Sequence, residues 1–420
     1  MWQSLNDGLT YLLSQSGPSL FHLFWFVIIF EFPRYTLSFV SVAASSFQSK
    51  APRRRDLRPS VSVVIAGHNE ADSIERCILS LREQSHPADE IIVVSDGSTD
   101  GMPAKLHELL RRGLIQEVHC TQLRSGKSAA VNLGMSRASG DIIAQVDCDC
   151  TFDRKALEEM VSPFADPRVG AVAGNIAVRN AHASLMASFQ ALEYLISLSQ
   201  GKQVANLTDQ MSCVSGALGA FRRTAIAQVG GLDAGSGEDL DLTLSLRASG
   251  WKTLFAPDAI CYTDVPATLL ALTRQRFRWE RDAVRLRYRK HRYLLNPFSE
   301  RFRPSELLHQ LDFLIFNVVA AIAFPFYLMW LFATYGKLAP IILFGAQVGM
   351  LCLDTFTFLL AALLNPRIAA FSLMPYLVGY DLFYVFLARF TRLAAFVQEW
   401  VLRSSYRDTY VPKKVHAVRT

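Results

Sequence analysis

The sequence predicts an α/β domain with a doubly wound, mostly parallel sheet, joined to α-helical transmembrane segments. Between residues 61 and 150, short β-branched runs alternate with helix-periodic segments, an order typical of parallel sheets that helices cover on both faces. Residues 19–47 and 307–388 instead hold long apolar runs, in a chain of 420 residues that is 51% hydrophobic.

These contrasts divide the chain into four parts. Residues 1–49 hold an N-terminal transmembrane segment, and residues 50–266 form the α/β domain. Residues 267–303 form a basic amphipathic helix at the membrane surface, and residues 304–420 hold C-terminal transmembrane helices with a basic tail. We expect a multi-pass protein of the cell membrane, in bacteria the inner membrane, with lipid as a partner.

The first apolar segment lies within Ser19–Val40 and contains Glu31 and Arg34 on either side of Pro33. Charges at bilayer depth are costly, so we expect them to pair, to face protein, or to mark the end of the span. The segment lacks the cleavage site of a signal peptide, so we expect it to be retained.

Positive charge is local, although the net charge of the chain is only +6. Five basic residues follow the first apolar run, at positions 50, 53, 54, 55 and 58, and residues 274–292 hold eight Arg and one Lys. The positive-inside rule then puts the N-terminus outside and residues 50–303 in the cytoplasm. A nucleic-acid partner is not expected, because the basic helix adjoins apolar runs. In that compartment the seven cysteines, none of them in a C-x-x-C pair, should be reduced thiols.

Three strands of the α/β domain are readable. Val61–Ala66, Glu90–Ser95 and Ile142–Val146 are β-branched runs, and a helix with Ile74, Cys77, Ile78 and Leu81 on its apolar face separates the first two. Ligands of such sheets bind beyond the carboxyl ends of the strands.

Three later apolar runs are long enough to cross a bilayer, namely Leu307–Thr334, Leu338–Leu363 and Ile368–Ala388. Three crossings would place the C-terminus outside, whereas the basic tail favours the inside. Either one run is re-entrant or interfacial, or a fourth crossing lies in Phe390–Leu402.

Acidic residues follow two of the predicted strands. Asp96 begins an Asp-Gly-Ser sequence that is also a common turn. Asp147 and Asp149 are two residues apart, so in an extended segment their carboxylates face one spot and repel each other unless a cation lies between them. Oxygen ligands suit Mg²⁺ or Mn²⁺. Cys148 and Cys150 then point the other way, into packing.

Three further sequences are candidates. Gly126-Lys127-Ser128 lacks the upstream glycine of a P-loop, but Lys127 suits either a nucleotide contact or a solvated helix start. Gly237-Glu238-Asp239 precedes a helix, so Asp239 is either a cap or a general base. Gln275, Arg278 and Trp279 lie on the basic helix, where Trp279 suits the membrane interface or a sugar face.

These motifs occur in a fixed order. Asn69-Glu70, Asp96-Gly-Ser, Gly126-Lys127, Asp147-x-Asp149, Ser215-Gly216, Gly237-Glu238-Asp239 and Gln275-x-x-Arg278-Trp279 follow one another and precede the apolar runs. This order resembles the processive family 2 glycosyltransferases, which include the cellulose, hyaluronan, chitin, chitooligosaccharide and poly-N-acetylglucosamine synthases. The resemblance covers residues 60–285 specifically and the membrane part loosely.

The resemblance implies a GT-A fold and an inverting, metal-dependent transfer of a sugar, N-acetylglucosamine first among the candidates, from a UDP-sugar to a β-linked polysaccharide or oligosaccharide that is extruded across the membrane. Mg²⁺ or Mn²⁺ would be bound by Asp149 and Asp147, and an accessory membrane subunit is a candidate partner. The implied roles are, for the nucleotide-sugar, Asn69, Glu70, Asp96, Lys127, Asp147, Gln275 and Arg278; for the acceptor, Ser215, Gly216 and Trp279; and for catalysis, Asp239 and Glu238.

Two alternatives stay open. One is non-processive transfer of a single sugar to a lipid carrier, against which the Gln275-x-x-Arg278-Trp279 motif argues. The other is a catalytically silent scaffold for another synthase, against which the intact Asp149 and Asp239 argue.

Overall fold

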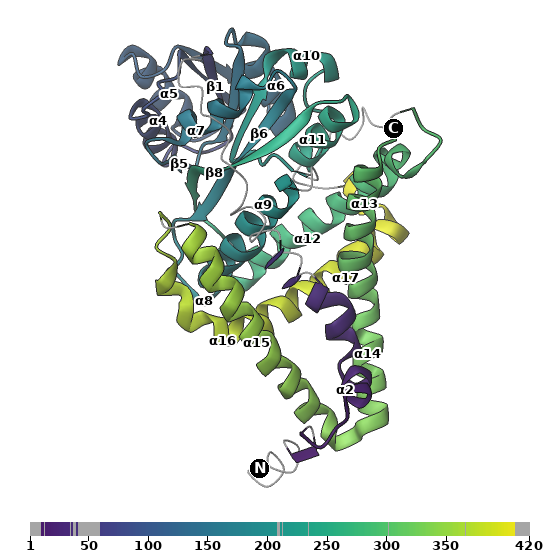
Figure 1. The fold of residues 1–420 in the computed structure, drawn as a ribbon. Coiled ribbons are helices and arrows are strands. Elements are labelled where there is room, and N and C mark those ends of the chain that lie inside the picture. Colours follow the sequence, from purple (N-terminus) through teal and green to yellow (C-terminus); the bar gives the residue numbers. More distant parts are fainter. Residues whose placement is uncertain are drawn as a thin grey trace.

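A sheet domain and a set of long apolar helices make up the molecule (Figure 1). The computed structural model describes residues 10–40 except 12, 34, 37 and 38, residues 59–207, and residues 211–407 except 212, 234, 301 and 366. The basic residues at positions 50–58 and Arg34 therefore lie outside the described residues, as does the tail beyond 407.

Within the described residues, one sheet of eight strands has the order β3-β2-β1-β4-β7-β6-β8-β5. The strands are β1 (Val61–Gly67), β2 (Glu90–Asp96), β3 (Glu117–Thr121), β4 (Ile142–Asp147), β5 (Thr151–Phe152), β6 (Val169–Val178), β7 (Leu218–Arg222) and β8 (Lys252–Thr263). The three strands that the sequence predicts correspond to β1, β2 and β4.

The sheet is parallel in its first half and mixed in its second. β3, β2, β1 and β4 run parallel, whereas β7 is antiparallel to both β4 and β6. β6 and β8 are parallel to each other, and the short β5 is antiparallel to β8. As a result β1, β2, β4, β6 and β8 all end at one edge, where β5 and β7 begin. We call it the carboxyl edge.

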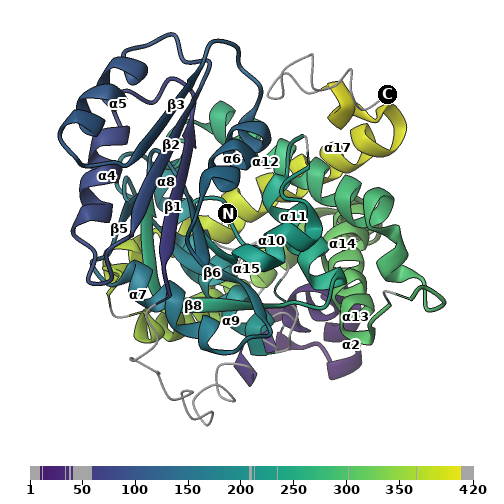
Figure 2. The same cartoon turned by 90° about the horizontal axis from the view of Figure 1, so that it is seen from above.

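Helices cover both faces of the sheet, as the sequence predicts. The first face carries α4 (Ile74–Arg82), α5 (Met102–Arg111) and α7 (Ala156–Val161), and the second carries α6 (Lys127–Arg137), α10 (Arg223–Val229) and α11 (Glu238–Ala248). Figure 2 shows α4 and α5 on one side of β1 and β2 and α6 on the other. The predicted stripe of α4 is fully buried, and alternate residues of β1 face the two cores, because successive side chains of a strand point to opposite faces.

Helical segments connect the sheet domain to the apolar helices. Between β6 and β7 lie α8 (Leu185–Glu193), η3 (Tyr194–Ser199) and α9 (Gln200–Leu207), and η2 (Ser162–Ala165) precedes β6. After β8 come α12 (Leu269–Arg285), η4 (Leu286–Lys290) and η5 (Arg292–Leu295). Thr268 caps α12, since its side chain accepts a hydrogen bond from the N–H of Ala271.

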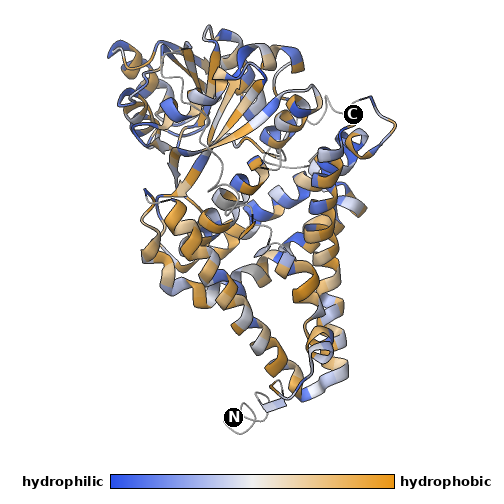
Figure 3. Ribbon diagram, viewed as in Figure 1, coloured by the Kyte–Doolittle hydropathy of each residue, from blue (hydrophilic) through white to orange (hydrophobic). Residues whose placement is uncertain are grey.

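The apolar helices contain two stretches that are long and apolar enough to cross a membrane, Pro304–Leu364 and Ala370–Leu402, as judged over the described residues. The first holds α13 (Pro304–Phe313), η6 (Leu314–Val319), α14 (Ala320–Tyr335), η7 (Gly336–Leu338) and α15 (Ala339–Leu364). The second holds η8 (Ala370–Tyr376), α16 (Leu377–Gly379), η9 (Tyr380–Val385) and α17 (Phe386–Leu402), which η10 (Ser404–Arg407) follows. Figure 3 shows the apolar character of α14 and α15, which extend away from the sheet domain.

The N-terminal segment packs beside these helices through α2 (Gly17–Leu23) and η1 (Val27–Glu31). Glu31 forms an ion pair with Arg389 of α17, and the hydroxyl of Tyr35 donates a hydrogen bond to Asp354 of α15. The guanidinium of Arg389 also lies 5.2 Å from the ring centroid of Phe26. The charge of Glu31 is therefore paired with protein, one of the outcomes that the sequence allows.

Helix α17 packs along α12 rather than standing apart as an isolated span. Arg392 of α17 lies 2.7 Å from Glu280 of α12, and Arg289 of η4 lies 2.7 Å from Glu399. The two helices run side by side in Figure 1. The segment Phe390–Leu402, which the sequence offers as a fourth crossing, is therefore joined by charge to the basic helix.

A buried ion pair fastens the sheet domain to the first long helix, and we expect its loss to be costly. Arg247 of α11 pairs with Glu306 of α13, with side chains 4% and 1% exposed. Arg247→Ala leaves a buried carboxylate without its cation, so we expect a loss of about 3–5 kcal/mol of stability, seen as a lower midpoint of thermal unfolding in detergent.

The exposed pair of Arg137 with Glu117, 2.7 Å apart, gives a matched control. Arg137→Ala should cost less than about 1 kcal/mol. Equal effects of the two substitutions would contradict the expectation.

Candidate active site

A cavity of about 300 Å³ opens at the carboxyl edge of the sheet. Its lining comes from the ends of β1, β2 and β4 and from the start of α6: Ala66, Gly67, His68, Glu70, Asp96, Arg124, Lys127, Ala130, Asp147, Cys148 and Asp149. Five of the residues singled out in the sequence, Glu70, Asp96, Lys127, Asp147 and Asp149, thus share one cavity.

Asp96 organises one wall of this cavity. It ends β2 and is 3% exposed, and its two carboxylate oxygens accept hydrogen bonds from the N–H groups of Ser125 (2.6 Å) and Gly126 (2.7 Å). Gly126 has φ of 94°, a conformation that favours glycine, and α6 begins directly after it. Asp96 therefore holds the turn that presents Lys127 to the cavity.

The loop after β1 brings Asn69 and Glu70 to the same edge, where Glu70 lines the cavity and Asn69 does not. Asn69 has φ of 61°, is exposed, and accepts a hydrogen bond from the N–H of Thr99 at 2.8 Å, so it fixes the loop beside the cavity rather than lining it. Glu70 accepts a hydrogen bond from Ser73 at 2.7 Å. Burial raises the pKa of Glu70, the Ser73 hydroxyl opposes this, and the carboxylates of Asp149 and Asp147 add to the rise.

Lys127 joins the two halves of the site. Its ammonium lies 2.7 Å from Asp147 Oδ1 and 3.4 Å from Glu238 Oε1 at the start of α11. A Cβ on Gly216, two residues before β7, would lie 2.9 Å from the same nitrogen, so a side chain at this position would displace the ammonium of Lys127. Because Val146 of β4 pairs with Leu218 of β7, the Ser215-Gly216 segment reaches the carboxyl edge.

Asp149 lies between the end of β4 and the start of β5. Its carboxylate accepts a hydrogen bond from the hydroxyl of Thr263 at 3.3 Å. Burial raises the pKa of Asp149, and the neighbouring Asp147 carboxylate adds to the rise. Cys148 and Cys150 are buried in the first core, and Cys148 also borders the cavity.

The chemistry of this lining fits a divalent cation held with a diphosphate. Glu70, Asp147 and Asp149 place carboxylates around one cavity. Burial raises the pKa of Glu70 and of Asp149, and neighbouring carboxylates add to both rises, so a cation would relieve repulsion. No cluster of three or more His, Cys, Asp or Glu able to hold a metal occurs in the described part of the chain. Mg²⁺ typically takes one or two carboxylates and completes its shell with phosphate and water, which suits a carboxylate pair.

The start of α11 supplies the remaining acids. Glu238 is 9% exposed, and burial raises its pKa, against the effect of Lys127 and with that of Asp239. Asp239 is half-buried in the first turn of α11, whose N-cap is Gly237, and its carboxylate accepts a hydrogen bond from the N–H of Leu240. Burial lowers the pKa of Lys202 and raises that of Cys213, and the Asp239 carboxylate opposes the first shift and adds to the second. Asp239 therefore lies near α9 and the segment before β7, and it is not among the residues that line the cavity.

The α12 residues lie apart from the cavity lining. Trp279 is 39% exposed, and the guanidinium of Arg276 lies 4.5 Å from its ring centroid. Arg276 is ion-paired with Glu193 of α8, and Gln275 Oε1 is buried without a hydrogen-bond partner among the described residues. None of the described residues that line the cavity comes from α12, so Gln275, Arg278 and Trp279 stay predictions.

The sequence reasoning missed several residues at this edge. His68, whose Nδ1 lies 2.8 Å from the carbonyl oxygen of Asp96, and Arg124 both line the cavity. His68 lies directly after β1 and Arg124 lies two residues before Gly126, and these positions in the sequence could have indicated both residues. Arg179 also contacts the backbone of Asp149 and pairs with Asp264, and sequence spacing carries no indication of either contact.

Glu238 gives a testable pH dependence. Its raised pKa means that the buried charged form disfavours folding at neutral pH. We expect Glu238→Gln, which cannot ionise, to raise the midpoint of thermal unfolding at pH 7.5. The difference should disappear as the pH falls below the ordinary carboxyl range, about 4.3. A substitution that destabilises the protein equally at both pH values would contradict this.

Comparison with known proteins matches one segment of the chain to a family. Residues 62–230 match the family described as Glycosyl transferase family 2. The chain is 27% identical over 320 residues to a poly-beta-1,6-N-acetyl-D-glucosamine synthase of Staphylococcus epidermidis, covering 73% of this chain and 75% of that protein. It is 29% identical over 266 residues to a synthase of the same name from Staphylococcus aureus strain MSSA476, covering 62% of each, so the chain spans less than two thirds of that relative.

Among solved structures, the mannosyltransferase PcManGT from Pyrobaculum calidifontis, in complex with GDP-Man and Mn²⁺, is similar with a TM-score of 0.62. The identity is 21%, and the match covers 90% of this chain and 99% of that one, a likeness that shows a shared fold. The α/β sheet with its carboxyl-edge cavity is accordingly the GT-A fold. With the matched segment and the synthase relatives, it shows that the chain is a glycosyltransferase, similar to family 2 over residues 62–230.

Proposed function

We propose that this enzyme transfers N-acetylglucosamine from its UDP-sugar to a growing β-linked polysaccharide. The observation that carries the proposal is the meeting of Asp147 and Glu238 on Lys127, beside a cavity that Asp96 and Asp149 also line. The sugar and the polymer are suggested by the names of the two synthase relatives.

The nucleotide would occupy the cavity between the ends of β1, β2 and β4. Glu70, Asp96 and Lys127 are the proposed contacts to the nucleoside and its phosphates, with Asn69 fixing the loop beside them. Asp147 holds the ammonium of Lys127 in position, so this positive charge is preorganised to bind a phosphate.

The sugar's leaving group is the diphosphate, and its charge must be offset as the bond breaks. When bound by Asp149 and Asp147, Mg²⁺ or Mn²⁺ would supply positive charge for the diphosphate. Arg278 and Gln275 of α12 are proposed to bind the same group from the membrane side. A charge-assisted contact from an arginine is well suited to a phosphate.

Asp239 is the proposed general base. It accepts the proton of the acceptor hydroxyl, while Glu238 remains paired with Lys127 and keeps the start of α11 in place. Attack by that hydroxyl from the side opposite the diphosphate inverts the anomeric centre. Trp279, with 39% of its surface exposed, and the Ser215-Gly216 segment are the proposed acceptor contacts.

The proposal includes extrusion of the product across the membrane. The support is the set of polar residues held between apolar helices, with Glu31 on Arg389 and Tyr35 on Asp354. Such groups are costly in lipid and commonly line a polar path. Product that stays accessible to an added glycosidase, in sealed vesicles with the sheet domain outward, would contradict extrusion.

The pairing of α17 with α12 suggests a membrane topology. The N-terminal segment, α14 and α15 would each cross once, and α17 would lie at the cytoplasmic surface with α12. The sheet domain and the basic tail then share the cytoplasmic side, which removes the conflict between three crossings and a basic C-terminus.

Single introduced cysteines test this topology in a variant without the native cysteines. In sealed vesicles with the sheet domain outward, a membrane-impermeant maleimide should label a cysteine at Ser404 but not one at Lys337, in the turn between α14 and α15. Labelling of both positions, or of Lys337 alone, would show that the assignment is wrong.

Product analysis tests the reaction itself. The purified enzyme with Mg²⁺ or Mn²⁺ should release UDP from UDP-N-acetylglucosamine and form a ladder of oligomers, measured by mass spectrometry. Asp239→Asn should lower turnover by about 10²–10⁴-fold, because the hydroxyl loses its base, while UDP binding is kept.

Leu240 beside it offers a matched control, since Leu240→Met keeps a side chain of similar volume. A single added sugar on a lipid would instead favour the non-processive alternative, and full turnover of Asp239→Asn would show that the base is another residue.

A further inference from the structure

We propose that Arg179 and Asp264 are positioning residues that hold Asp149 at the cavity, with Thr263 orienting its carboxylate. The inference rests on the proposed function, in which Asp149 binds the metal that accompanies the diphosphate. It concerns residues at the ends of β6 and β8, outside the motifs that the sequence brings forward.

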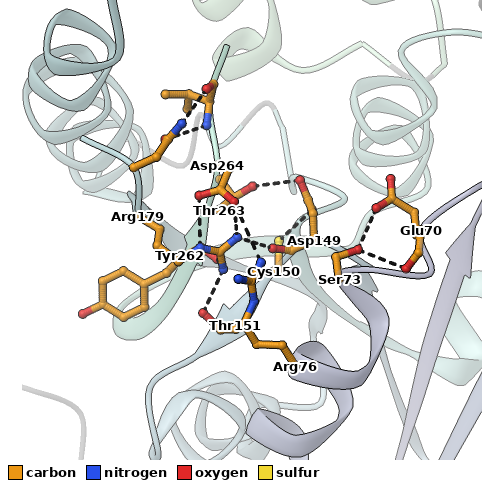
Figure 4. Close-up of polar contacts among 12 residues, drawn as sticks. Glu70, Ser73, Arg76, Asp149, Cys150, Thr151, Arg179, Tyr262, Thr263 and Asp264 are labelled. Atoms are coloured by element: carbon orange, nitrogen blue, oxygen red, sulfur yellow. Dashed lines mark hydrogen bonds and ion pairs between the residues drawn. The ribbon is translucent and has the colours of Figure 1, made fainter. Parts of the chain in front are cut away.

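One guanidinium joins three segments of the chain. Arg179, directly after β6, donates from Nη2 to the carbonyl oxygen of Asp149 at 2.8 Å. Its Nε and Nη2 also donate to the two carboxylate oxygens of Asp264, at 3.0 and 2.6 Å, and its Nη1 donates to the hydroxyl of Thr151 at 3.2 Å. Figure 4 shows these contacts converging on Arg179.

The contacts fall on both sides of Asp149. β4 ends at Asp147 and β5 begins at Thr151, so Asp149 sits in a short turn between them, closed by a hydrogen bond from the N–H of Cys150 to the carbonyl of Asp147. Arg179 binds the backbone of Asp149 and the side chain of Thr151, which fixes the turn from outside. The planar fork of an arginine suits such divergent partners, whereas a lysine presents a point charge.

The carboxylate of Asp149 is held by the last residue of β8. Thr263, the last residue of β8, donates from its hydroxyl to Asp149 Oδ2 at 3.3 Å, and its carbonyl accepts a hydrogen bond from the N–H of Arg179 at 2.9 Å. Asp264 follows directly. Thr263 thus holds the carboxylate of Asp149, and Thr263 and Asp264 together hold Arg179.

Exposure separates this role from a simple contribution to stability. The side chain of Asp264 is 45% exposed and that of Arg179 is 23% exposed, and ion pairs this exposed contribute little to folding. Groups that orient a metal ligand commonly change metal affinity by about 10–100-fold when they are replaced. The pair should therefore affect metal binding much more than unfolding.

The test measures Mn²⁺ binding by the full-length protein in detergent with UDP, from the electron paramagnetic resonance signal of free Mn²⁺. Arg179→Lys should raise the dissociation constant of Mn²⁺ about 10-fold or more and leave the midpoint of thermal unfolding close to wild type. Turnover should recover at saturating Mn²⁺, so the Mn²⁺ concentration for half-maximal rate rises more than the maximal rate falls. Asp149→Ala, which removes the proposed metal ligand, gives the free-Mn²⁺ signal expected when the site binds no metal.

Arg168 provides a matched control at the other end of the same strand. Arg168 directly precedes β6 and forms a bidentate ion pair with Asp166, with a shortest distance of 2.8 Å. It is not among the residues that line the cavity. Arg168→Lys should change neither Mn²⁺ affinity nor turnover.

Two outcomes overturn the inference: a folded Arg179→Lys that binds Mn²⁺ as wild type does, or an equal effect of Arg168→Lys. If Arg179→Lys fails to fold, Thr263→Val, which removes one hydroxyl at nearly constant volume, decides instead, and unchanged Mn²⁺ affinity there overturns the proposal. Failure of the proposed function is distinct, because the wild-type protein itself would then bind no Mn²⁺ with UDP.

Discussion

The placement of one lysine between two acids is the constraint on which the site depends. Lys127 contacts Asp147 at the end of β4 and Glu238 at the start of α11, segments that lie more than 90 residues apart. Without the ammonium, the buried Glu238 would face the other carboxylates unpaired, at a large cost in free energy. The absence of a side chain at Gly216 and the turn held by Asp96 both serve this placement.

Much of the parallel half of the fold follows from the sequence, because its determinants are local. The buried strands are continuous β-branched runs, and the acids that follow β2 and β4 meet because parallel strands end at one edge. Asp96, Asp147 and Asp149 were predicted on that ground, whereas Glu70 and Lys127 were implied by the resemblance, and all five line one cavity. Their individual roles remain predictions.

The second half of the sheet could not be read in this way. β7 runs antiparallel to β4, and only that reversal brings Gly216 to Lys127. Likewise, Arg179 reaches Asp149 because β6 and β8 end at the same edge, a consequence of strand order rather than spacing. In the apolar part, hydropathy predicts the helices but not the ion pairs of α17, because the partners of its charged residues lie more than 100 residues earlier.

The long-range pairing of α12 with α17 has a consequence for biosynthesis. The sheet domain is complete once about residue 263 has left the ribosome, and domains generally fold as units during synthesis. Glu280 gains Arg392, and Glu31 gains Arg389, only after more than 100 further residues have been made. A nascent chain would thus hold a folded sheet domain well before α12 has its partners on α17, and the complete arrangement would form as one late step of assembly.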